Sequence, residues 1–190
     1  PELYDLHRLD SDYGAKHDHH GCADPVLVDD VVRVRAIGSE GAPAWVAQED
    51  GLLSAALDSR TMNHQIWKVE SDRTAGPLWT GDYIYFLGEG AEGPAYIDAP
   101  PPQGRGIAPL AARWQDRGDW QKFVIHKGED LDAHPLSAVC YGEELFLQTH
   151  YGTFVDTHQG RVLARWKHRG DWQKVAFERV GQEAGHGGEL

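Results

Sequence analysis

Near the start of the chain, a histidine-rich stretch holds residue types that could bind a metal ion. His17, His19 and His20 are followed closely by Cys22. Neutral imidazole and thiolate are good ligands for zinc or copper, and on an extended strand His17 and His19 point the same way. The alternative is a solvated arm that holds no cofactor. A closed site needs a further ligand from a distant part of the chain, for which the candidates are His126, His134 and His150.

The sequence carries no familiar catalytic motif. It lacks the Gly-x-Ser-x-Gly, glycine-rich phosphate-loop and His-Glu-x-x-His patterns that position a nucleophile, a phosphate or a zinc ion. We therefore expect a binding protein. If the protein is an enzyme, its acid/base histidines lie in the first 30 residues, where Tyr13 and the histidines at 17, 19 and 20 could meet the folded domain and support a hydrolase or lyase.

The composition and net charge of the chain limit the kinds of partner that we expect it to bind. The chain has 190 residues, of which 41% are hydrophobic, and this suits one globular domain. Its formal charge of −12 disfavours nucleic acid and anionic membranes, because phosphate binding needs a basic face. Neutral or cationic ligands fit better. No apolar run approaches the roughly 20 residues of a membrane helix, so we expect a soluble protein without membrane insertion.

Cys22 and Cys140 are the only cysteines of the chain. Two cysteines are too few for a disulfide framework, although one bridge could form in an oxidising compartment. The start, Pro1-Glu2-Leu3, has no basic segment followed by an apolar stretch and so predicts no signal peptide. We expect a cytoplasmic protein in preference to a secreted one, while a mature secreted protein would also have lost its signal.

A repeat dominates the second half of the chain. Residues 110–125, LAARWQDRGDWQKFVI, align with residues 162–177, VLARWKHRGDWQKVAF, at an offset of 52, and nine of the sixteen positions are identical. A weaker third copy lies upstream, where Gln65-Ile66-Trp67 matches Gln121-Lys122-Phe123 and Gln173-Lys174-Val175. The chain therefore contains three diverged copies of one unit.

Each copy has the pattern of four short strands, in which apolar and polar residues alternate between Gly, Asp and Pro turns. Three such units predict a closed β-trefoil, since propellers usually have four or more blades. We predict an all-β fold with an N-terminal extended arm at 1–30, units at about 31–75, 76–130 and 131–180, and a flexible tail at 181–190. The expected threefold core consists of Trp67, Phe123, Val175, Tyr96 and Phe154.

The third copy resembles a fascin-like repeat. Within residues 145–177, a strand is followed by Tyr-Gly-x-Phe-Val, then by Val-Leu-Ala after a Gly-containing turn, and then by Gly-Asp-Trp-Gln-Lys-Val. The Gln-x-aromatic or Gln-x-aliphatic position of each copy also resembles the Gln-x-Trp signature of ricin B-type lectins. The resemblance covers residues 31 to about 180 and implies a β-trefoil.

The ricin-type resemblance implies a shallow sugar pocket in each active copy. An Asp accepts hydrogen bonds from sugar hydroxyls, and an aromatic ring packs on the C–H face of the sugar beside the signature Gln. The residues carried over by position are Asp98, Trp114 and Gln121 in the second copy and Asp156, Trp166 and Gln173 in the third. At the corresponding positions the first copy has Ala47 in place of the acid, Asp58 in place of the aromatic ring, and Gln65 as the signature glutamine. We therefore expect a lectin-like module that binds a glycan or glycoprotein at two pockets.

Two departures from that pattern leave an alternative open. Trp120 and Trp172 stand where ricin-type repeats usually carry Asn, whereas fascin-like repeats place a structural Trp there and often bind proteins. The alternative is thus a protein-binding or inhibitory trefoil. The tripeptide Arg-Gly-Asp at 117–119 and 169–171 spells an integrin ligand, but its place before a repeat strand favours a tight turn with Gly at positive φ and Asp bonded to its own backbone.

Overall fold

The computed structural model describes residues 22–56, 66–90, 92–102, 106–128 and 137–180. Within these residues the chain forms β-strands and two 3₁₀ helices, η3 (Asp119–Gln121) and η4 (Asp171–Gln173). No helix of this part is long and apolar enough to cross a membrane.

Each repeat supplies four strands, as the sequence predicted, and in the second repeat the third of them is divided into two segments. The first repeat contains β1 (Val31–Arg35), β2 (Ala44–Ala47), β3 (Leu53–Ala56) and β4 (Trp67–Ser71). The second contains β5 (Tyr83–Gly90), β6 (Gly93–Asp98), β7 (Ala108–Pro109), β8 (Ala111–Trp114) and β9 (Phe123–Lys127). The third contains β10 (Leu145–Thr149), β11 (Phe154–His158), β12 (Arg161–Trp166) and β13 (Ala176–Arg179). In the second repeat the third strand is split, because β7 pairs with β12 and β8 pairs with β6.

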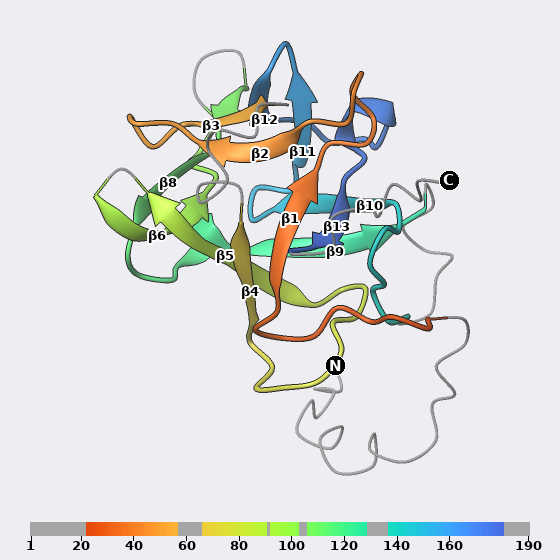
Figure 1. Cartoon of the computed structure of the whole chain (residues 1–190). Helices are drawn as coiled ribbons and strands as arrows, with labels where there is room; N and C mark the ends of the chain where they lie inside the picture. The colour runs from red at the N-terminus through yellow and green to blue at the C-terminus, as the bar shows by residue number, and fades with distance from the viewer. Residues whose placement is uncertain (1–21, 57–65, 91, 103–105, 129–136, 181–190) are drawn as a thin grey trace, which may run out of the picture.

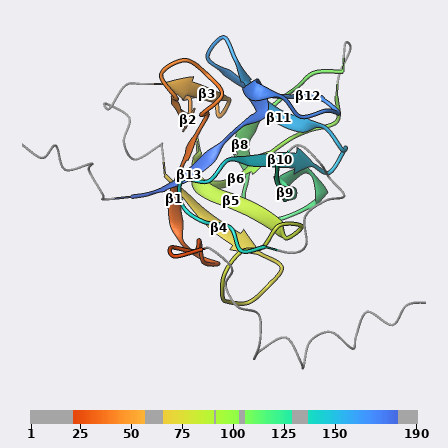
Figure 2. The same ribbon diagram turned by 90° about the vertical axis from the view of Figure 1, so that its right-hand side faces the viewer.

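Six strands close into a barrel. β1 pairs with β13 and β4, β5 pairs with β4 and β9, and β9 pairs with β10. The ring closes through two reciprocal backbone bonds between Leu145 and Val175, with N···O distances of 2.8 and 2.9 Å. The hairpins β2–β3, β6–β8 and β11–β12 pair with one another through β3, β7 and β12. Both views place β2, β3, β11 and β12 at one end of the molecule and the start of the described chain at the other (Figures 1 and 2). This arrangement is a β-trefoil.

Phe86 is the ring around which the core is organised. It is fully buried and lies edge-on to Trp45, Phe123 and Phe177, with ring centroids 6.3, 5.7 and 5.9 Å away. These three rings come from the first, second and third repeats, so every repeat contributes to one shared core. Edge-to-face packing of this kind adds to the stability gained by burial.

The expected core residues divide into two groups. Trp67, Phe123 and Val175 lie in the central cluster, whereas Tyr96 and Phe154 are buried outside it. Successive residues of a strand face opposite sides, and in the second and third repeats Ile97 and Val155 take the inward positions. Tyr96 and Phe154 therefore pack on the outer side of the hairpins, and the Tyr96 hydroxyl donates to Glu70 at 2.7 Å.

A threefold ring of backbone hydrogen bonds covers the other end of the barrel. The N–H of Val26 donates to Val139, that of Val139 to Leu78, and that of Leu78 to Val26, each at 2.8 Å. All three side chains are fully buried in the central cluster. The described part of the predicted arm, residues 22–30, thus lies against the barrel and contributes one corner of this ring, while residues 1–21 lie outside the described part.

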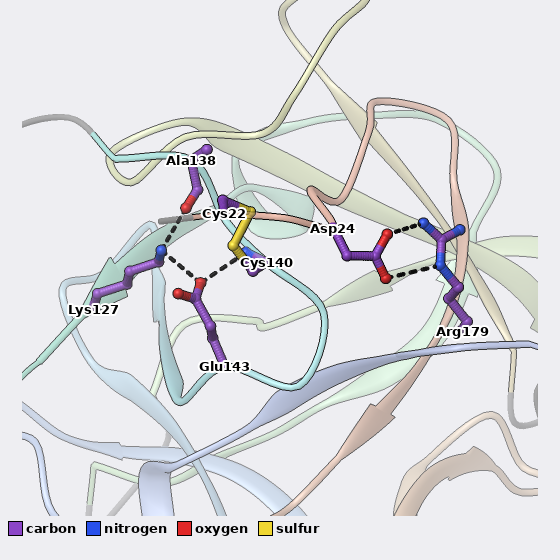
Figure 3. The surroundings of a disulfide bond; sticks show 7 residues. All are labelled: Cys22, Asp24, Lys127, Ala138, Cys140, Glu143 and Arg179. Carbon is purple, nitrogen blue, oxygen red and sulfur yellow. Dashed lines mark hydrogen bonds and ion pairs between the residues drawn. A yellow bond between two sulfur atoms is a disulfide. The ribbon is translucent and has the colours of Figure 1, made fainter. Parts of the chain in front are cut away.

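A disulfide fastens this segment to the third repeat. Cys22 is bonded to Cys140 across a sequence separation of 118 residues. Figure 3 shows the bridge between two ion pairs: Lys127 with Glu143, at 2.6 Å, and Asp24 with Arg179. Glu143 also accepts the backbone N–H of Cys140 at 2.7 Å. The sequence left this single bridge open, and the structure forms it.

We predict that loss of the disulfide weakens the fold. Because the bridge closes a long loop, its removal in a Cys22→Ser/Cys140→Ser variant should lower the free energy of unfolding by about 2–4 kcal/mol. Denaturant unfolding of the wild type with and without reductant measures this directly. Reductant should leave the double variant unaffected, and an unchanged wild-type midpoint after complete reduction, verified by thiol titration, would contradict the prediction.

Candidate binding site

The loop that follows β8 exposes two indole rings beside an open cleft. We call residues 114–121 the Trp114 loop. Trp114 is 52% exposed and Trp120 is 39% exposed, which is high for the largest apolar side chain. The cleft has a volume of about 400 Å³. Its lining consists of Trp114, Asp116, Arg117, Gly118, Asp119, Trp120 and Gln121.

The floor of the loop is built by Gln121 and Gly118. Gln121 is 5% exposed, and its backbone N–H donates to the carbonyl of Gly118 at 3.2 Å. Gly118 is extended, with φ −151°, so the expected positive φ is wrong. Instead, a Cβ at Gly118 would lie 3.0 Å from Oε1 of Gln121, and one at Gly170 would lie 3.1 Å from that of Gln173. Close approach of the glutamine side chain therefore favours glycine here, and Arg-Gly-Asp leads into a 3₁₀ helix.

The arginine of the same tripeptide anchors the loop. The guanidinium of Arg117 lies 5.1 Å from the ring centroid of Tyr85, and its Nε lies 3.5 Å from Oε2 of Glu70. In the third repeat the Arg169 guanidinium lies 5.4 Å from the ring of Phe146 in the corresponding strand. Cation–π contacts of this kind hold each arginine against the hairpin. These contacts hold the arginine of the tripeptide against the domain, and they therefore do not favour its presentation as an integrin ligand.

The acids expected in the sugar pockets are buried in ion pairs. Asp98 is 0% exposed, and its carboxylate accepts from Nη2 and Nε of Arg113 at 2.7 and 3.3 Å. Asp156 is 1% exposed and forms a fork of the same kind with Arg165. Burial raises the pKa of both carboxyls, and the arginines oppose that shift. Both carboxylates are thus engaged by arginine and do not line the cleft.

The structure therefore brings together two of the three residues expected in the second repeat. Trp114 and Gln121 line the same cleft, and Asp98 lies beneath Arg113. The carboxylates at the cleft are those of Asp116 and Asp119, which the sequence analysis did not assign to the sugar pocket. The signal that could have found them is the spacing between the two tryptophans, which leaves the intervening residues as a loop.

The corresponding loop of the third repeat, residues 166–173, is called the Trp166 loop. Trp166 and Trp172 are 42% and 50% exposed, and Gln173 is buried. Each indole lies beside an imidazole: Trp166 is 5.5 Å from the ring of His168, and Trp172 is 4.8 Å from that of His158. The two loops thus share an aromatic frame.

The other expected positions form no site within the part of the chain that the structure describes. In the first repeat Ala47 is buried, and Asp58 and Gln65 lie outside the described residues. The metal set loses its thiolate because Cys22 is in the disulfide. His17, His19 and His20 lie outside the described part, and within that part no group of three His, Cys, Asp or Glu side chains could hold a metal ion.

Comparison with known proteins shows the fold. No family model matches the chain, and no curated protein matches it in sequence. A Caenorhabditis elegans protein of unknown function superposes with a TM-score of 0.65 at 9% identity, covering 83% of this chain and 97% of that one. The SDF2-like protein from Arabidopsis thaliana gives 0.60 at 6% identity, covering 80% and 94%. The designed threefold symmetric protein ThreeFoil gives 0.54 at 17%, covering 79% and 99%. These likenesses support a trefoil and do not test sugar binding.

We predict that the two buried acids differ in their importance for stability. In the third repeat the Arg165 side chain is only 13% exposed, so Asp156→Asn leaves a buried cation without its counter-charge and should cost about 3 kcal/mol. The Arg113 side chain is 42% exposed and can turn to water, so Asp98→Asn should cost about 1 kcal/mol. Denaturant unfolding of both variants measures the difference. Equal losses of unfolding free energy in the two variants would show that the exposure of the paired arginine does not determine the effect of the substitution.

Proposed function

We propose that the protein is a β-trefoil binding module that takes carbohydrate at the Trp114 and Trp166 loops. The observation that carries the proposal is the presence of two half-exposed indoles, Trp114 and Trp120, on one open cleft. Leaving large apolar rings in water forgoes the free energy of burial, and paired exposed aromatics mark binding surfaces. The indole face packs well on the C–H surface of a pyranose ring.

The polar groups around the indoles supply the hydrogen bonds that a sugar needs. Asp116 and Asp119 are exposed at the cleft, and their carboxylates can accept bonds from vicinal hydroxyls. In this proposal Asp98 and Asp156 act indirectly. They hold Arg113 and Arg165 next to the tryptophans, and the Arg165 guanidinium lies 5.5 Å from the ring of Trp166.

A protein partner is the second candidate. Tryptophan and arginine are enriched among the residues that dominate protein interfaces, and both loops combine them. The fascin-like resemblance implies protein binding, and under this reading the exposed indoles of the loops enter pockets of a partner protein. Both candidate functions use the Trp114 and Trp166 loops, and they differ in whether the ligand is a carbohydrate or a protein.

The disulfide also bears on where the protein acts. Bridges form and persist in oxidising compartments and are rare in the cytosol, so the Cys22–Cys140 bond favours a secreted or otherwise oxidising location. We therefore propose this location in place of the cytoplasmic one expected from the sequence.

A glycan screen with loop variants tests the function. Wild-type protein should bind a defined set of glycans, and Trp114→Ala/Trp166→Ala should weaken that binding about three- to tenfold per loop, because the stacking surface is lost. The matched control is Trp114→Phe/Trp166→Phe, which keeps an aromatic face and should retain most of the binding. Both pairs should leave the unfolding midpoint nearly unchanged, since the rings are half-exposed. Glycan binding unaffected by the alanine pair would contradict the assigned site, and absence of any glycan ligand would favour the protein partner.

A further inference from the structure

Trp114 lies between two clefts that both carry carboxylates. It borders the cleft of the Trp114 loop, where Asp116 and Asp119 lie, and also a second cleft of about 300 Å³. The second cleft is lined by Asp50 and Glu92 among other residues, and Trp114 is the one residue common to both linings. Acidic groups therefore flank the exposed indole on two sides.

The positive charges at these clefts are already engaged. Arg113 forms its two-bond pair with Asp98, and Arg117 is held by Glu70 and the Tyr85 ring. By contrast, Asp116 and Glu92 are exposed, and within the described part of the chain neither has a hydrogen-bond or ion-pair partner. Asp119 lies 3.6 Å from Nζ of Lys122, so the unpaired negative charge beside Trp114 comes from Asp116 and Glu92.

An indole face attracts a cation through its quadrupole, and nearby carboxylates add to that attraction. The chain as a whole carries a formal charge of −12, which raises the local concentration of cations. We propose that the Trp114 site takes saccharide units that carry a protonated amine, so its ligand class is an amino-sugar oligomer with free amino groups. This inference rests on the proposed carbohydrate function and specifies the ligand of one of its two loops.

The third repeat provides a comparison within the same molecule. Lys167 and His168 stand at the positions of Gln115 and Asp116, while the flanking tryptophans and the Arg-Gly-Asp are the same. The Trp166 loop therefore presents a similar aromatic frame with added positive charge. A protonated amine is favoured at the Trp114 loop and not at the Trp166 loop.

Calorimetry with two matched oligosaccharides tests the inference. The probes are a β-1,4-linked glucosamine tetramer and its fully N-acetylated counterpart, at about pH 6, where the free amines are protonated. Wild-type protein should bind the glucosamine tetramer about tenfold more tightly than the acetylated one, and raising the salt from about 0.05 to about 0.5 M should reduce this preference. Glu92→Gln/Asp116→Asn should reduce the preference about three- to tenfold and weaken binding of the acetylated tetramer only slightly, because each substituted amide keeps an oxygen that accepts hydrogen bonds from sugar hydroxyls.

Two control variants test whether the amine preference depends on the carboxylates beside Trp114 or on the negative charge of the chain as a whole. Glu40→Gln removes an exposed acid in the β1–β2 connection and should keep the preference, as should Trp166→Ala. A preference that also disappears in Glu40→Gln, or that survives in Glu92→Gln/Asp116→Asn, would overturn the assignment to Trp114. Equal binding of the two tetramers would overturn the amine preference while leaving carbohydrate binding in place. Binding of neither tetramer would overturn the inference, and the glycan screen would then decide the proposed function separately.

Discussion

The shared core around Phe86 is the constraint on which the other features depend. Its three contacting rings come one from each repeat, and the backbone hydrogen bonds of Val26, Leu78 and Val139 join the arm to the second and third repeats. No repeat can bury its apolar face or pair its backbone groups alone. Barrel closure also removes the free strand edges that would otherwise be open to pairing with other chains. The Trp114 and Trp166 loops are thereby held in place by a core to which their tryptophans do not contribute.

The residues of the two tryptophan loops can thus be divided into those that the fold needs and those that it does not. The repeated arginine, glycine and glutamine of the two loops each have a structural reason: ring contact, close approach and burial. The indoles of Trp114 and Trp166 gain less from packing, since about half of each side chain faces water, although the Arg165 guanidinium lies 5.5 Å from the Trp166 ring. Both copies nevertheless keep the ring at the same place. A feature that appears twice and that packing does not explain is better explained by what it contacts outside the chain.

Local patterns predicted the trefoil because turns and strand alternation are encoded within a few residues. The offset of 52 residues likewise located both tryptophan loops. The direction of Asp98 could not be predicted, because it depends on Arg113 of a paired strand across a β-bulge between Tyr96 and Ile97. The Cys22–Cys140 bond joins residues 118 apart, and a sequence with two cysteines leaves their pairing open. What was missed thus depends on contacts that only the closed fold creates.

The Trp114 and Trp166 loops share an aromatic frame and differ in their charged side chains. The effects of shape and of charge on the choice of ligand can therefore be considered separately. Their glycines, glutamines and indoles occupy matching positions, so a difference in ligand between them cannot arise from the frame. It must arise from the side chains that vary, of which Gln115 and Asp116 in the Trp114 loop and Lys167 and His168 in the Trp166 loop are all exposed. A carboxylate beside an indole strengthens the attraction for a cation, whereas an imidazole beside an indole offers a neutral or positive neighbour. Under the proposed function, repetition of one unit would provide two sites with a common geometry, and substitution of a few loop residues would give them unlike ligands.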